Sequence, residues 1–310
     1  MAVAAVTVCA TGQWCGEASP VAALLHAVWA VSPDDVFAVG DGGLILRRNN
    51  DAWTVMDSGT TNKLRGVWGA SSSDVWATGL GGTILHFDGT AWSPVVATTS
   101  EIDAVWGASS TDVWFIGQGT VLHWNGASFQ LTNFTGSLLS VSGTGPSDVW
   151  ITGENAAVRH FNGTSWALTS TGAGTNSYFA VLALASNDVW LADFASGKET
   201  MHWNGSRWTG LHTGSGIVFQ SLSALASNDV WGAGGRNIGH FTGTAWSFDD
   251  HDRQRLGRRG CRPDPASQLL ATGRRGAHLE ARATRRRARG GSQRGRTGSR
   301  RVRRDGIIDT

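Results

Sequence analysis

The sequence has few cysteines and no long hydrophobic run. Every apolar stretch falls short of the roughly 18 residues that a membrane-spanning helix needs, so such a helix is excluded. Of the three cysteines, Cys9 and Cys15 are close enough in sequence to form a small disulfide loop in an oxidising compartment. No second Cys or His pair accompanies them, which argues against a structural zinc site.

The sequence also lacks a convincing leader and the common catalytic signatures. Residues 1–10 are apolar but have no basic stretch before them, so they make a poor signal peptide, and we expect the true start to lie upstream. There is no Gly-x-Ser-x-Gly, phosphate loop or His-Glu-x-x-His. We therefore expect no catalytic activity, no cofactor and no metal.

One short phrase, Asp-Val-Trp or Asp-Val-Phe, returns six times. The separations between successive copies are 39, 38, 36, 40 and 41 residues, a period that indicates one structural unit repeated in tandem. The Asp residues of the six copies are Asp35, Asp74, Asp112, Asp148, Asp188 and Asp229.

Each unit predicts four short β-strands. In residues 63–97, four apolar runs alternate with Ser-, Gly- and Asp-Gly-rich turns, and Asp-Gly or Asn-Gly between apolar runs is a strong hairpin signal. Four antiparallel strands per unit are typical of a β-propeller blade. We predict an all-β fold: a propeller of six blades over residues 25–249, derived from seven, after a Cys-containing segment at 1–24.

The repeated polar and aromatic residues have structural interpretations. The Asp of each unit follows a turn, where its carboxylate can accept backbone N–H bonds. Two Trp series pack within and between blades. Five units have a His just before the third turn, and we expect hydrogen bonding there and not a metal site, because the units are far apart. Trp124 and Trp203 break the pattern, and so become candidate ligand contacts if they are exposed. The inserts at 171–177, 194–200 and 210–216 are further candidates.

The phrase Val-Trp-Gly-Ala-Ser-Ser-x-Asp-Val-Trp-Ala-x-Gly, best seen in residues 66–79, resembles the tandem propeller repeats of secreted or surface proteins from myxobacteria. That resemblance covers residues 9–249 and implies an extracytoplasmic, non-enzymatic propeller. The unit is more distantly similar to propellers of the photosystem II assembly-factor type and to the Asp boxes of sialidases. Sialidase chemistry needs a Tyr nucleophile and three converging Arg, and the single Tyr178 lacks suitable neighbours.

Charge divides the chain near residue 250. Residues 1–250 have eight basic and 19 acidic residues, whereas residues 251–310 have 18 Arg, no Lys and five acidic residues. Such a tail cannot bury a core, and we expect it to be disordered. A nucleic-acid arm is one interpretation. We favour a frameshift, because one choice of codons for residues 253–260, read one nucleotide later, spells Gly-Asn-Val-Trp-Ala-Val-Gly.

Together these observations predict a monomeric, extracellular or cell-surface binding scaffold whose partner is an unknown protein or glycan. A glycan-binding lectin is the main alternative. A glycoside hydrolase is the second, and it requires two carboxylates within about 5–10 Å of one another.

Overall fold

The computed structural model describes residues 5–8, 14–17, 19–50, 52–155, 157–172, 174, 176–193, 199–212, 217–235 and 237–250. Cys9 of the predicted disulfide lies outside these residues, as does the predicted Arg-rich tail after residue 250. No helix in the described ranges is long and apolar enough to cross a membrane.

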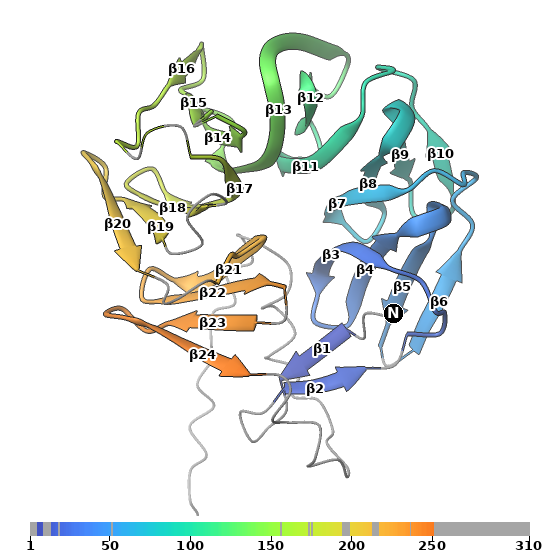
Figure 1. Cartoon of the computed structure of the whole chain (residues 1–310). Helices are drawn as coiled ribbons and strands as arrows, with labels where there is room; N and C mark the ends of the chain where they lie inside the picture. Colours follow the sequence, from blue (N-terminus) through green and yellow to red (C-terminus); the bar gives the residue numbers. More distant parts are fainter. Residues whose placement is uncertain are drawn as a thin grey trace, which may run out of the picture. The chain divides into compact units, whose positions relative to one another are not determined.

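Four of the repeats each form one four-stranded antiparallel sheet (Figure 1). The first consists of β3 (Leu25–Ser32), β4 (Asp35–Gly40), β5 (Ile45–Asn49) and β6 (Ala52–Met56), with the 3-10 turn η1 (Asp41–Gly43). The second consists of β7 (Leu64–Ser71), β8 (Asp74–Gly79), β9 (Ile84–Phe87) and β10 (Trp92–Pro94), with the 3-10 turn η2 (Leu80–Gly82). The fifth repeat forms β17 (Tyr178–Ala185), β18 (Asp188–Asp193), β19 (Glu199–Trp203) and β20 (Trp208–His212). The sixth forms β21 (Ser221–Ala226), β22 (Asp229–Gly234), β23 (Asn237–Phe241) and β24 (Trp246–Asp250).

The third and fourth repeats share one sheet, so the propeller has five blade sheets in place of the six that we predicted. The strands of this sheet are β11 (Ile102–Ser109), β12 (Asp112–Trp124), β13 (Phe129–Gly145), β14 (Asp148–Gly153), β15 (Arg159–Phe161) and β16 (Trp166–Leu168). Strand β13 pairs with β12 through its first part and with β14 through residues 138–145. The last strand of the third repeat therefore continues directly into the first strand of the fourth. A separate two-stranded sheet holds β1 (Ala5–Val8) and β2 (Trp14–Glu17).

The Asp-Gly and Asn-Gly turns form as predicted. In the second repeat, the Asp88 carboxylate accepts the backbone N–H groups of Thr90 and Ala91 at 2.8 and 3.0 Å. Gly89 between them has a φ of 97°, a left-handed conformation that favours glycine. The same arrangement recurs at Asn125, Asn162 and Asn204.

The strand order gives the propeller two distinct faces. Because neighbouring strands are antiparallel, their connections alternate between the two ends of each sheet. One end, here the turn face, carries the turns from first to second and from third to fourth strands. The other end, the loop face, carries the connections from second to third strands and from one repeat to the next. In Figure 1 the first strands β3, β7, β11, β17 and β21 lie innermost.

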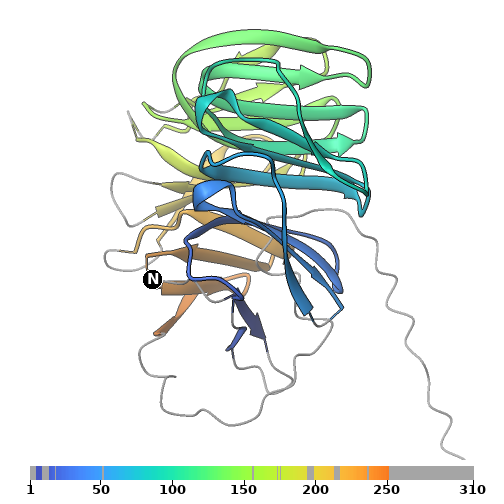
Figure 2. The same cartoon turned by 90° about the vertical axis from the view of Figure 1, so that its right-hand side faces the viewer.

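The sheets of neighbouring repeats lie one above the other (Figure 2). A third Trp series, on the first strands, fills the space between the first three of them. Trp29, Trp68 and Trp106 lie on the first strands of the first three repeats and are buried. The Trp29 and Trp68 rings are 6.0 Å apart, and the Trp29 indole donates a 3.0 Å hydrogen bond to the Gly69 carbonyl. The core therefore extends from sheet to sheet around the inner strands.

Candidate functional site

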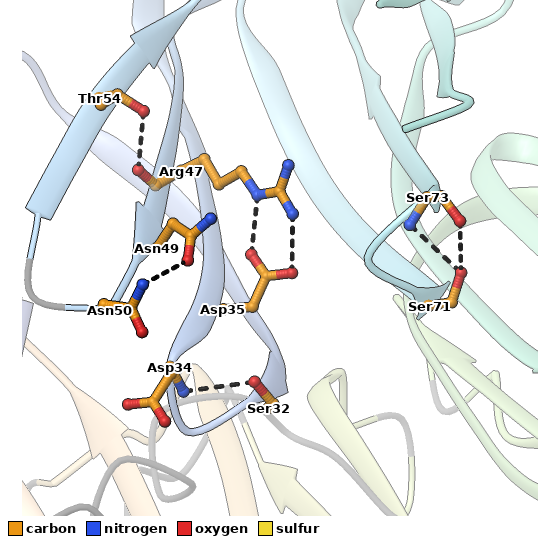
Figure 3. Close-up of polar contacts among 9 residues, drawn as sticks. All are labelled: Ser32, Asp34, Asp35, Arg47, Asn49, Asn50, Thr54, Ser71 and Ser73. Atoms are coloured by element: carbon orange, nitrogen blue, oxygen red, sulfur yellow. Dashed lines mark hydrogen bonds and ion pairs between the residues drawn. The ribbon is translucent and has the colours of Figure 1, made fainter. Parts of the chain in front are cut away.

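The repeated His and Asp residues pair with one another inside each repeat. His Nε2 lies 2.7–2.9 Å from an Asp oxygen in the pairs His86–Asp74, His160–Asp148, His202–Asp188 and His240–Asp229. In the third repeat the His123–Asp112 distance is 3.5 Å. In the first repeat Arg47 replaces the histidine and donates from Nε and Nη2 to the two oxygens of Asp35 at 2.8 and 3.0 Å (Figure 3). The expectation that each histidine is hydrogen-bonded within its blade is confirmed for four of the five; His123 Nε2 is buried and has no hydrogen-bond partner within the described residues.

In the third to sixth repeats a Trp of the second strand completes the network. Its indole Nε1 donates to the Asp two residues earlier at 2.8–3.0 Å in Trp114, Trp150, Trp190 and Trp231. In the second repeat the Trp76 indole N–H has no hydrogen-bond partner among the residues described, and the first repeat has Phe37 at this position. The imidazole lies against the same indole, with ring centroids 3.8–4.4 Å apart in the five histidine-containing repeats. Across the described part of the chain, no three His, Cys, Asp or Glu side chains gather as a metal site would require.

One prediction about these Asp residues was wrong in its detail. Their carboxylates accept side-chain donors, and not the backbone N–H groups of the preceding turn. That role belongs to serine: the Ser32 hydroxyl accepts the Asp34 N–H at 3.3 Å, and the Ser71 hydroxyl accepts the Ser73 N–H at 3.2 Å (Figure 3). The Asp is therefore left free to organise the His and Trp of its own blade.

In two of these carboxyls the pKa is lowered, which favours the ionised form. Burial by itself raises the pKa of Asp148, but hydrogen bonds from His160, Thr144 and Trp150 outweigh it and lower the pKa below its ordinary value. The pKa of Asp188 is lowered in the same way: burial opposes, while His202, Ser227 and Trp190 prevail. Ser227 belongs to the following repeat, so this network also joins two blades.

The lowered pKa values predict a specific acid sensitivity. A carboxyl whose pKa is lower in the folded than in the unfolded protein stabilises the fold above the unfolded value, near 3.8, and that stability is lost as the pH falls through the folded value. We expect the urea midpoint to fall between about pH 5 and pH 2, and Asp188→Asn to reduce that fall. If the urea midpoint falls equally with pH in Asp188→Asn and in wild type, Asp188 is not a source of this acid sensitivity.

Trp124 and Trp203 are half-buried in aromatic clusters. The Trp124 ring lies 5.0 Å from Phe129 and 6.2 Å from Trp76. The Trp203 ring lies 5.4 Å from Trp208 and 6.3 Å from Trp150. Ligand binding at these two positions stays a prediction, and their packing gives it no support. Parts of all three candidate inserts lie outside the described residues.

The first strands carry a feature that the sequence did not reveal. In five repeats a β-bulge adds one extra residue to the first strand, close to the loop face. The bulge residues are His26, Arg65, Asp103, Leu139 and Phe179. A bulge changes the direction of a side chain and does not require a particular residue type. The residue at this position can therefore differ between repeats while the sheets keep the same structure.

The bulge residues of the first three repeats belong to two neighbouring clusters of ion pairs, together called the charged rim: His26, Asp41 and Lys63 in one, and Arg65, Glu101 and Asp103 in the other. Asp41 pairs with His26 at 2.8 Å and with Lys63 at 3.0 Å. These two partners lower the pKa of the Asp41 carboxyl. Arg65 pairs with Asp103 and, at 3.4 Å, with Glu101. Such exposed pairs contribute little stability, because water and salt screen the attraction between their charges.

The later repeats present apolar bulge residues, Leu139 and Phe179, in place of charges. The inner edge of the loop face is therefore charged along the first three repeats and apolar along the next two. The described carboxylates of the rim are paired with cations, and their arrangement offers no free acid and base as a catalytic pair.

Comparisons with known proteins identify the fold. No family model matches the chain, and no curated protein matches it. Solved β-propellers do. YCF48 bound to a D1 peptide aligns at 14% identity with a TM-score of 0.62 over 76% of this chain and 84% of its own. YCF48 from Cyanidioschyzon merolae aligns at 16% identity with a TM-score of 0.59, over 75% and 86%. The WD40 propeller domain of Doa1 aligns at 11% identity with a TM-score of 0.64, over 80% and 87%. At these identities the likeness establishes that the chain has a β-propeller fold.

Proposed function

We propose that the protein is a non-catalytic, extracytoplasmic binding scaffold that holds a polypeptide partner on its loop face. The observation that carries this proposal is the change of bulge residue from repeat to repeat. His26, Arg65 and Asp103 occupy the positions that Leu139 and Phe179 occupy later in the chain. A surface with charged and apolar parts is suited to a peptide that carries both kinds of side chain.

Two further observations support the proposal. The repeated His and Asp residues, which would otherwise be candidates for catalysis, are engaged in the networks that hold each blade together. A propeller of similar fold, YCF48, has been solved with a bound peptide. The extracytoplasmic location is inferred from the resemblance of the repeat phrase to surface proteins. The packing of Trp124 and Trp203 does not favour the lectin alternative.

The proposal predicts that variants of the bulge residues on the loop face lose peptide binding while keeping their fold. Peptides selected from a random library on the full chain should bind Arg65→Gln and Leu139→Glu at least tenfold more weakly than wild type, a loss of about 1.4 kcal/mol. Both side chains are partly exposed, so the thermal midpoint should change little. Binding is measured by calorimetry against each variant.

A matched control is Arg207→Gln, which removes an exposed charge from the turn face. It should leave peptide affinity unchanged. If the selected peptides bind both bulge variants as tightly as wild type, or if Arg207→Gln abolishes their binding, the binding surface lies elsewhere. Binding of glycans that is abolished by Trp124→Ala would instead support the lectin alternative.

A further inference from the structure

Arg159 occupies a position that the first, second and fifth repeats fill with a buried apolar side chain and the sixth with Gly239. Arg159 pairs with Ile151 on the second strand and Leu168 on the fourth. Leu46 and Leu85 have the same register in the first two repeats, and Met201 has it in the fifth. Those three side chains are 1–5% exposed. The packing of the blade requires only an apolar side chain at this position, so it does not explain why the fourth repeat has an arginine.

The guanidinium of Arg159 is partly desolvated and has no counterion. Its carbon lies 4.5 Å from the centre of the Phe134 ring, and burial lowers the pKa of Arg159. Nη1 is sealed from solvent and has no hydrogen-bond partner. No acidic side chain pairs with this guanidinium within the described ranges. Placing an uncompensated cation in such surroundings costs stability that a leucine would not cost.

A hollow of about 380 Å³ adjoins Arg159 on the loop face, a size in the range of small-ligand sites. It lies at the junction of the third and fourth repeats, where β13 runs through and the two blades merge. Its polar lining includes Thr135, Asn155, Thr169 and Ser170. The fourth repeat thus differs from the others in two ways, by sharing its sheet with the third repeat and by having an arginine at a core position. Both differences lie next to this hollow.

The charges of the hollow select the kind of ligand. Arg159 is its only lining cation among the described residues, and the exposed Glu154 is its only lining acid there. A singly charged, planar anion matches one guanidinium, which can donate two parallel hydrogen bonds to it. A doubly charged phosphate group would be repelled by Glu154 without a second cation to offset it.

We propose that this hollow binds a carboxylate group, which pairs with the guanidinium of Arg159 from the solvent side. The hydroxyl and amide groups of the lining supply further donors to the carboxylate. The group belongs either to a free small carboxylate or to a peptide, as an acidic side chain or a chain terminus. The hollow is separate from the charged rim, so its occupation does not depend on whether the rim binds a polypeptide.

The experiment titrates the full chain with three probes: butyrate, a short neutral peptide with a free C-terminal carboxylate, and the same peptide amidated. Binding is followed by calorimetry and by the NMR signal of the Arg159 side-chain Nε–H. We expect saturable binding of butyrate, of the free-ended peptide, or of both, while the amidated peptide does not bind. Binding of butyrate alone indicates a free small ligand, and preference for the free-ended peptide indicates a polypeptide ligand.

Variants separate this role from a structural one. Arg159→Leu and Arg159→Gln should each lose at least tenfold in affinity, whereas Arg207→Leu on the turn face should lose none. Arg159→Leu should also raise the urea midpoint, because it restores the apolar residue found in the first, second and fifth repeats. The proposal is overturned if no probe binds saturably, if Arg159→Gln binds as well as wild type, or if inorganic phosphate binds as tightly as the carboxylates.

Discussion

Replacing Asp188 with alanine should lower the free energy of unfolding by about 3–5 kcal/mol, as expected when one partner of a buried charged network is removed. The Asp188 carboxylate accepts hydrogen bonds from His202 at 2.9 Å, from Trp190 at 3.0 Å and from Ser227 of the next repeat. Without it, the Trp190 indole N–H loses its acceptor in a side chain that is only 1% exposed. An unpaired buried donor alone costs about 1–3 kcal/mol.

The loss is measured by urea unfolding at neutral pH, with Asp34→Ala as the matched control. Asp34 is an exposed turn residue whose carboxylate makes no hydrogen bond among the described residues, so its replacement should change stability by less than about 0.5 kcal/mol. Asp188→Asn keeps the shape and one acceptor and should lose less than Asp188→Ala. Similar midpoints for Asp34→Ala and Asp188→Ala would show that the network does not stabilise the fold.

The sequence predicted the strands of each repeat because the local signals were strong and consistent. Asp-Gly or Asn-Gly turn pairs, such as Asp88-Gly89, agreed with the apolar runs on either side of them in four of the six units. The count of sheets was wrong because the junction between the third and fourth repeats has no clear break. The spacing from Asp112 to Asp148 is 36 residues, the shortest in the chain. A short connection leaves little chain for a separate loop, and β13 runs straight through with Gly136 at a φ of 88°.

The side-chain networks were harder to predict than the strands, because they depend on register. His160 follows Asp148 by 12 residues and stands opposite Trp150 across the hairpin. Only the paired register brings these three side chains together. The bulges likewise cannot be recognised in the sequence, because one extra residue in a strand changes no local signal. Arg159 is the exception: superposing the repeats on their Asp residues sets it in line with Leu46 and Leu85, and so marks it as unusual.

The packing between neighbouring repeats follows a size rule that can be tested. A residue of one first strand faces a small residue of the next first strand, and their sizes are complementary. The successive pairs are Trp29 with Gly69, Trp68 with Gly107, Trp106 with Gly143, Ser142 with Ala183, and Leu182 with Ala224. A methyl group on Gly107 would lie 2.5 Å from the Trp68 ring, and one on Gly143 would lie 2.6 Å from the Trp106 ring. At these two junctions glycine therefore leaves the space that the Trp of the preceding repeat fills, whereas a methyl group on Gly69 would first meet Val75, at 2.9 Å.

Gly143→Ala should lower the free energy of unfolding by about 1–3 kcal/mol, the usual cost of overpacking a core. Gly145→Ala, two residues further along β13, is the matched control, because a methyl group there meets nothing within 4 Å. It should be neutral or stabilising by up to about 1 kcal/mol, since alanine restricts the unfolded chain. Urea unfolding of the two variants measures the difference.

A second substitution tests whether contact with the Trp106 ring causes the loss of stability expected in Gly143→Ala. The added methyl would also approach the Asp148 carbonyl at 2.6 Å, but the fifth repeat accommodates Ala183 in the same register opposite Val189. The backbone contact is therefore tolerable, and the ring is what distinguishes the two repeats. In a Trp106→Leu background, which imitates the Leu182–Ala224 pair, Gly143→Ala should cost at least about 1 kcal/mol less than in wild type. If the two substitutions add without coupling, the size rule does not govern this interface.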